Sequence, residues 1–221
     1  MDLFLKIIKW PVGFFSVFLL PAVFLKFVFL LKNSFSLAFS PFVLGMFVYW
    51  ALWKFFFKNP YAGSAFPVLE HELTHALFAL LTFRRIKNIS VSWNSGGQVR
   101  FSGSGNWLIT LSPYFFPLLS IIVILTGSLF STHTSFVFKF ILGITSMYNL
   151  ISTYREIHPA QTDIQKEGYI YFLLFNPGMF LFFYGIIWSF VLNGFYGVKF
   201  FTTSVFNVSL GFFMRFLHLF I

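Results

Sequence analysis

The sequence contains no cysteine among its 221 residues. Disulfide bonds, thiolate metal ligands and cysteine nucleophiles are therefore excluded, and cysteine usage does not indicate the redox compartment. Charged residues are also scarce, at 10% of the chain, and only six of them are acidic. A metal site or a general base must therefore be built from five histidines, six carboxylates and asparagine side chains.

Apolar residues are abundant instead. Hydrophobic residues make up 58% of the chain, aromatic residues make up 24%, and the mean hydropathy is +0.82. Soluble globular domains do not have this composition. We therefore predict an all-α polytopic membrane protein, with residues 1–221 as a single integral membrane domain and about six transmembrane helices of about 20 residues each. The apolar runs place helices at about 11–31, 35–57, 64–83, 106–129, 134–152 and 169–193. The sequence leaves open whether a last apolar segment, about 199–221, crosses the membrane or lies along its surface.

The net charge of +9 is typical of positively charged loops and of contact with anionic lipids in a membrane protein. The basic residues are scattered and form no arginine-rich run. This pattern argues against nucleic-acid binding and favours the lipid bilayer as the partner of the protein surface.

The pentad His71–His75 reads His-Glu-Leu-Thr-His and lies within the apolar run of the predicted helix 64–83. Positions i and i+4 share one face of a helix, so His71 and His75 can bind one metal ion there. Glu72, one residue further round, can reach water held by that ion, as in zinc hydrolases. Unpaired polar side chains in lipid cost about 2–3 kcal/mol each, which favours a functional role. The alternative is two core histidines hydrogen-bonded to neighbouring helices, with Glu72 paired to one of them.

A catalytic zinc site needs a third protein ligand and one open position. We favour Asp163, because Thr162 resembles an N-cap and would place Asp163 in the first turn of the helix 169–193. His158, in the same loop at about 153–168, is the second choice, although Asp163 could also serve only to complement the helix dipole. Asn149 is an alternative ligand, or can bind substrate or the oxyanion, or can bridge helices. The remaining candidates are Glu156, Glu167, His133 and His218.

The membrane depth of the third ligand presents a difficulty. The two histidines lie near the middle of the helix 64–83, whereas Asp163 begins a later helix about 10 Å higher, at about 1.5 Å per residue. Either that later helix starts deep in the membrane, or the helix 64–83 lies high. The segment Asn176-Pro177-Gly178 favours a break in the later helix.

Residues 88–102 have a different periodicity from the rest of the chain. Ile89, Val91 and Trp93 alternate with polar residues, and the pattern resumes at Val99 after the turn-forming segment 94–97. We predict a short β-hairpin directly after the helix 64–83, with an ordinary surface loop as the alternative. An edge strand of this hairpin can pair with the backbone of an extended substrate.

Together these residues resemble the site-2 protease family of intramembrane zinc metalloproteases, in particular small bacterial members without a PDZ domain. The resemblance covers about residues 64–190 and rests on the pentad, the glycine-containing hairpin, the segment Leu108–Pro113 and the pair Thr162–Asp163. The chain departs from the family pattern in having Ser112 and Ile164 where the family usually has glycine. Its Asn-Pro pair, Asn176–Pro177, follows the aspartate rather than preceding it.

The resemblance implies a zinc metalloendopeptidase that hydrolyses peptide bonds of transmembrane protein substrates. One Zn²⁺ per chain is expected on His71, His75 and Asp163, with Glu72 as the catalytic base, in a multi-pass protein of the bacterial inner membrane. The alternative is a membrane metal-binding or transport protein, or a non-proteolytic scaffold, that uses the same histidines. Transport would require more polar positions along the helices, and a scaffold has no need of the base Glu72.

Overall fold

The computed structural model describes residues 2–57, 65–92, 96–130 and 135–219. Its helices and strands are α1 (Asp2–Asn33), α2 (Ser40–Leu52), the π-helical turn η1 (Trp53–Phe57), α3 (Ala65–Leu81), β1 (Ile86–Ser92), β2 (Gly96–Phe101), α4 (Trp107–Leu111), the 3₁₀ turn η2 (Ser112–Tyr114), α5 (Leu118–Leu129), α6 (Phe136–Glu156), α7 (Thr162–Glu167) and α8 (Tyr169–Leu217). The predicted helix at 64–83 and the predicted hairpin at 88–102 are both confirmed.

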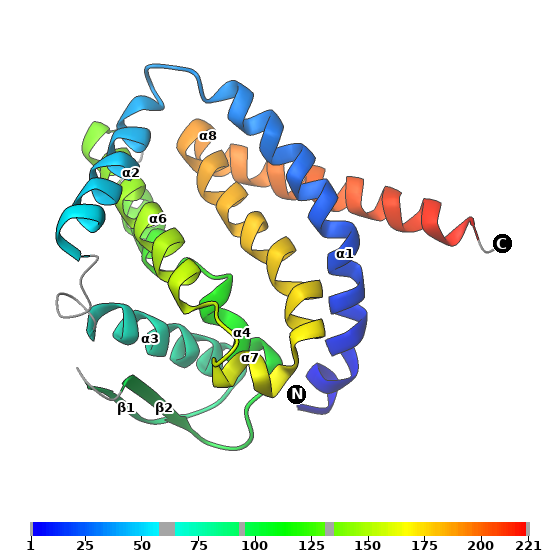
Figure 1. The fold of residues 1–221 in the computed structure, drawn as a ribbon. Coiled ribbons are helices and arrows are strands. Elements are labelled where there is room, and N and C mark those ends of the chain that lie inside the picture. The colour runs from blue at the N-terminus through cyan, green and yellow to red at the C-terminus, as the bar shows by residue number, and fades with distance from the viewer. Residues whose placement is uncertain (1, 58–64, 93–95, 131–134, 220–221) are drawn as a thin grey trace.

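Long apolar helices dominate the fold. Within the described ranges four helices are long and apolar enough to cross a membrane, namely α1, α2 with η1, α6 and α8. The bent pair formed by α4–η2 and α5 raises the number to five if it counts as one span, which roughly fits the predicted six. The chain is therefore an integral membrane protein. Figure 1 shows α1, α6 and the first half of α8 slanting in similar directions, whereas α2 slants the other way and α3 runs across the lower left of the view with the hairpin beneath it.

The backbones of α2 and α6 approach each other closely at two glycines. A Cβ atom on Gly45 would lie 2.0 Å from the carbonyl oxygen of Phe140, and one on Gly143 would lie 2.1 Å from that of Phe42. Glycine is needed at both positions because any side chain would overlap the facing backbone. Such small-residue contacts are a common basis for helix association in membranes.

Replacing Gly143 with valine is therefore expected to destabilise the protein. Overpacking in a well-packed interior costs about 1–3 kcal/mol, and each kcal/mol lowers the Tm of a chain of this size by about 2–4 °C. Thermal unfolding in detergent measures the change. Ile141→Val, at a position of α6 that is 42% exposed, is the control and should melt like the wild type. An unchanged Tm for Gly143→Val would contradict the close contact between α2 and α6.

The predicted single helix 106–129 is wrong. The chain forms α4, continues through η2, and starts again as α5, with a bend of 82° between the two helical parts. Pro113 and Pro117 have no N–H group, so the helical hydrogen-bond ladder cannot pass through this segment unchanged. The bend allows α4 to contact α3 and α7 while α5 packs against α6.

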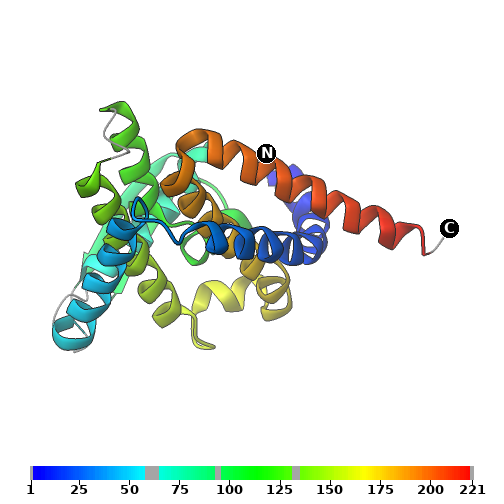
Figure 2. The same ribbon diagram turned by 90° about the horizontal axis from the view of Figure 1, so that it is seen from above.

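The predicted break at Asn176–Gly178 is also wrong. Helix α8 continues through Pro177, and its interruption lies at Asn193 (φ −139°, ψ 20°) and Gly194 (φ 58°, ψ −148°). The change of direction therefore separates the two apolar segments predicted at 169–193 and 199–221. After it, the chain packs against the middle of α1 through a core of Leu19, Ala22, Val23, Phe201 and Val205. Both ribbon views show the C-terminal half of α8 projecting beyond the rest of the molecule (Figures 1 and 2).

The hairpin is antiparallel and lies against α3. Ile89 pairs with Val99 and Val91 pairs with Gly97, with an irregularity between Ile86 and Asn88. The predicted turn falls partly on residues 93–95, which lie outside the described residues. The sheet contains two strands within the described part of the chain, so one edge of β2 is not paired with a strand.

Candidate metal centre

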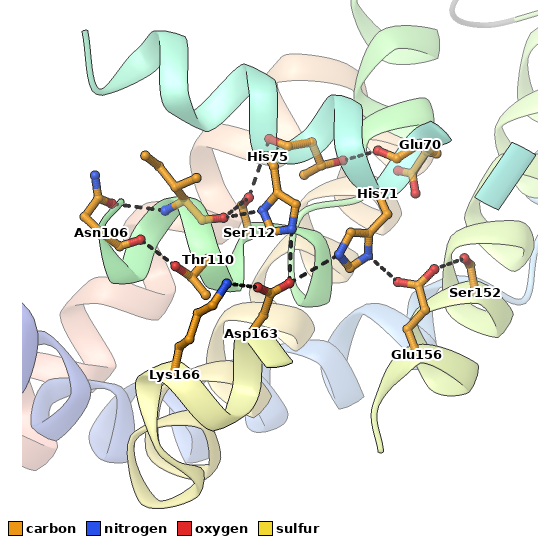
Figure 3. Close-up of polar contacts among 12 residues, drawn as sticks. Glu70, His71, His75, Asn106, Thr110, Ser112, Ser152, Glu156, Asp163 and Lys166 are labelled. Atoms are coloured by element: carbon orange, nitrogen blue, oxygen red, sulfur yellow. Dashed lines mark hydrogen bonds and ion pairs between the residues drawn. The ribbon is translucent and has the colours of Figure 1, made fainter. Parts of the chain in front are cut away.

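Helix α3 places His71 and His75 one turn apart on the same face. Their ring centroids are 4.7 Å apart, and the Nε2 atoms of both rings face Asp163 of α7 (Figure 3). The distance to Asp163 Oδ2 is 3.6 Å from His71 Nε2 and 3.2 Å from His75 Nε2. One ligand atom of each residue lies within 4.8 Å of the others, so the three side chains can hold one metal ion.

The second nitrogen of each imidazole has its own acceptor. His71 Nδ1 lies 2.8 Å from Glu156 Oε2, and His75 Nδ1 lies 2.8 Å from the backbone carbonyl oxygen of Ile109. Both partners accept hydrogen bonds, so each ring can donate from Nδ1 and leave Nε2, the nitrogen nearer to Asp163, as the atom that would bind a metal ion. The donor set therefore fits a divalent metal ion bound by nitrogen and oxygen.

The short helix α4 holds the carbonyl group that orients His75. Asn106 caps this helix, because its Oδ1 accepts hydrogen bonds from the N–H groups of Leu108 and Ile109 at 3.1 and 3.0 Å. Ser112 Oγ also donates to the Ile109 carbonyl oxygen, at 2.8 Å. No sequence pattern pairs this backbone acceptor with His75, and the Asn106 cap is the one local signal for the helix that carries it.

Asp163 lies in the first turn of α7, but not as the sequence analysis predicted. Gln161 occupies the N-cap position and makes no side-chain capping bond, so the prediction of Thr162 as N-cap is wrong by one residue. Gly168, with φ at 90°, separates α7 from α8, so Asp163 does not belong to the first turn of the long helix. The expected loop 153–168 is reduced to residues 157–161, because α6 extends to Glu156 and α7 begins at Thr162.

The surroundings of Asp163 keep its carboxyl group ionised. Burial by itself raises the pKa of Asp163, but hydrogen bonds with His71 and His75 outweigh it and hold the pKa well below its usual range. Lys166, one turn later, adds a cation 3.5 Å from Oδ1. Asp163 is therefore available as an anionic ligand at neutral pH.

Glu72 and the strand β2 enclose the same site. The backbone of Val99 hydrogen bonds to the buried Glu72 carboxylate. A Cβ atom on Gly97 would lie 2.5 Å from Glu72 Cγ and 2.7 Å from Val68 Cγ1, so β2 passes directly over this part of α3. A cavity of about 730 Å³ lies between α3, β2, α4 and α7, and its lining includes His71, Glu72, His75, Gly97, Thr110 and Asp163.

A comparison with protein families assigns the chain to a known group. The family described as Peptidase M50B-like matches residues 60–198, which is more than half of the chain and includes the pentad and Asp163. The chain belongs to the Peptidase M50B-like family. This family indicates the site-2 protease group of membrane metalloproteases, as the sequence resemblance implied. Neither the curated proteins nor the solved structures include a match to this chain.

The other predicted site residues of this M50B-like peptidase lie away from the three ligand atoms. Asn149 is buried, donates to Glu70 Oε1 at 3.3 Å and accepts from Ser120 Oγ at 3.2 Å, so it bridges α3, α5 and α6. His158 is exposed, and its Nδ1 accepts a hydrogen bond from the N–H of Ala160 at 3.2 Å. Neither residue is among the described residues that line the cavity.

Proposed function

We propose that this chain is a zinc-dependent intramembrane metalloprotease that hydrolyses peptide bonds of membrane-embedded protein substrates. The observation that carries the proposal is the convergence of ligand atoms from His71, His75 and Asp163 in a cavity that also contains Glu72. The proposal includes one zinc ion per chain and a multi-pass location in a bacterial inner membrane.

The ligand set suits a catalytic rather than a structural zinc site. Two imidazole nitrogens and one carboxylate oxygen would provide three protein ligands, the number found in catalytic zinc sites, which keep one position for water or substrate. When bound, zinc supplies a Lewis acid that lowers the pKa of water to about 7 and polarises the scissile carbonyl group.

Glu72 acts as the general base and then as the general acid. Its carboxylate accepts a proton from the attacking water, whose oxygen forms a bond to the carbonyl carbon. Glu72 then delivers that proton to the amide nitrogen as the C–N bond breaks. The products are a carboxylic acid and an amine, and transfer of the acid proton to the amine gives the carboxylate and ammonium groups present at neutral pH. Glu72 is buried beside β2, in the wall of the cavity that would hold the substrate.

The substrate must be extended before it can react. A transmembrane helix holds its carbonyl groups in its own hydrogen bonds, so the scissile segment has to unwind. The edge of β2 that is not paired with β1 offers backbone groups to such a segment, directly over Glu72. Substrate pairing with β2 would therefore bring an unwound carbonyl group to the metal centre.

Replacing Gly97 with valine tests the contact between β2 and α3. The added methyl groups would overlap Glu72 and Val68 and push the strand away, so we expect cleavage to fall at least about tenfold, the cost of about 1.4 kcal/mol in the barrier, with zinc retained. Cleavage of a tagged peptide in liposomes and zinc analysis of the same sample measure both effects. Asn88→Ala, at an exposed position of β1 that does not line the cavity in the described part of the chain, is the control and should keep activity. Wild-type cleavage by Gly97→Val would remove β2 from the mechanism.

The proposed function itself is tested by zinc content and by cleavage of a membrane substrate. The full chain is purified in detergent, analysed for metal, and reconstituted with a tagged single-span peptide that carries a helix-breaking Asn-Pro pair. We expect about one zinc per chain, and cleavage that stops on chelation and returns with zinc. Protein that carries no zinc after purification and binds none on titration would overturn the proposal.

A further inference from the structure

Glu156 contacts the metal centre from outside the ligand set. It is the last residue of α6, and its Oε2 lies 2.8 Å from His71 Nδ1, on the far side of the ring from Asp163 (Figure 3). Its other oxygen, Oε1, accepts a hydrogen bond from Ser152 Oγ at 3.0 Å. The side chains of His71 and Glu156 are only 12% and 20% exposed, so solvent screens this contact weakly.

The position of Glu156 is unfavourable for its own helix. The C-terminus of a helix carries partial negative charge, so a carboxylate in the last turn is repelled where a cation would be stabilised. Asp163, in the first turn of α7, has the opposite and favourable arrangement. Helix preference therefore does not account for Glu156, whereas its contact with His71 does.

The two histidines differ in what orients them. His75 donates to the neutral carbonyl group of Ile109, whereas His71 donates to the charged carboxylate of Glu156. A carboxylate acceptor makes an imidazole a stronger ligand and fixes the ring and its tautomer. The orientation of His71 therefore depends on a side chain, which a substitution can remove, whereas that of His75 depends on a backbone carbonyl group, which a substitution leaves in place.

We propose that Glu156 is a positioning residue that sets the affinity of the metal centre through His71, and that Ser152 holds its carboxylate in place. The proposal rests on the metal site described under the proposed function. Glu156 keeps the proton on Nδ1, so that Nε2 is the atom that faces the ion, and its negative charge partly balances the charge of that ion.

The test compares zinc affinities of full-length protein by competition with a chromophoric chelator. We expect Glu156→Gln to raise the Kd for zinc about 10–100-fold. Glu70→Gln is the matched control, because Glu70 is a buried carboxylate beside His71 whose hydrogen bond goes to Asn149 instead. Its Kd should stay at the wild-type value. Ser152→Ala keeps the Glu156 charge but removes its hydrogen bond, so a smaller rise is expected.

The visible spectrum of cobalt-loaded protein provides a second measurement, which would not change if Glu156 only stabilised the fold. The visible spectrum of cobalt-loaded protein reports the ligand geometry, so Glu156→Gln should shift it and Glu70→Gln should not. Wild-type zinc affinity and an unchanged cobalt spectrum for Glu156→Gln would overturn the proposal. If Glu156→Gln does not fold, an unchanged zinc Kd for Ser152→Ala would overturn it instead. If the wild type itself binds no zinc, the proposed function fails together with the role of Glu156. If the wild type binds zinc and Glu156→Gln binds it equally well, only the role of Glu156 fails.

Discussion

Glu72→Gln is expected to abolish peptide cleavage while the protein keeps its zinc. Glutamine has the size of glutamate and can still accept the hydrogen bond from the Val99 backbone, so β2 should stay in place. It cannot accept the proton of the attacking water, and loss of general acid–base catalysis lowers rates by about 10²–10⁴-fold. Single-turnover cleavage of a tagged peptide in liposomes, together with zinc analysis of the same sample, measures both effects.

The matched control for this variant is again Glu70→Gln, two residues earlier on α3. Glu70 is equally buried, but its carboxylate hydrogen bonds to Asn149 and does not line the cavity in the described part of the chain. This variant should cleave at a rate close to that of the wild type. Wild-type cleavage by zinc-loaded Glu72→Gln would remove Glu72 from its role as the base.

Asp163→Ala is expected to remove the zinc. The substitution deletes one of three ligands and also the only negative charge among them. The loss of affinity should therefore exceed the about 10–100-fold typical of residues that only orient a ligand. Elemental analysis after purification, followed by zinc titration with a competing chelator, measures the loss.

Lys166→Ala is the control for the Asp163 variant. Lys166 lies 3.5 Å from Asp163 Oδ1, but its side chain is 67% exposed, so water replaces it easily. Zinc affinity close to that of the wild type is expected. Zinc retained by Asp163→Ala but lost by His71→Ala would leave the metal site in place and remove Asp163 from it.

Local patterns predicted the elements that carry the site. The helix containing His71 and His75 and the hairpin over 88–102 both follow from periodicity, because burial of one helix face or one strand face depends on residues close in sequence. The composition likewise predicted an integral membrane protein, since the long apolar helices need no tertiary contact to be recognised.

Long-range geometry could not be predicted in the same way. The acceptors for the two histidines come from α4 and from the end of α6, and no local pattern pairs Ile109 with His75 or Glu156 with His71. The bend between α4 and α5 was the exception, because Pro113 and Pro117 indicate it and the prediction of one helix overlooked them.

The difficulty about depth came from treating every helix as a parallel span. The prediction assumed that Asp163 begins the long helix α8. It also assumed that the two histidines lie halfway along a helix parallel to α8. Gly168 instead separates the short helix α7 from α8, and α3 runs across the lower part of the molecule in Figure 1. Asp163 can therefore lie 3.2 Å from His75, because it precedes the long helix α8, which begins at Tyr169.

The separation of the ligands along the chain has a consequence for biosynthesis. His75 and Asp163 are 88 positions apart, and α4, α5 and α6 lie between them. At about 5–20 residues per second, a ribosome adds Asp163 roughly 4–18 s after His75. The nascent chain therefore carries its histidine pair for several seconds before it can complete a metal centre. On the proposed function, neighbouring membrane proteins would therefore meet no complete active site until most of the new chain has been translated.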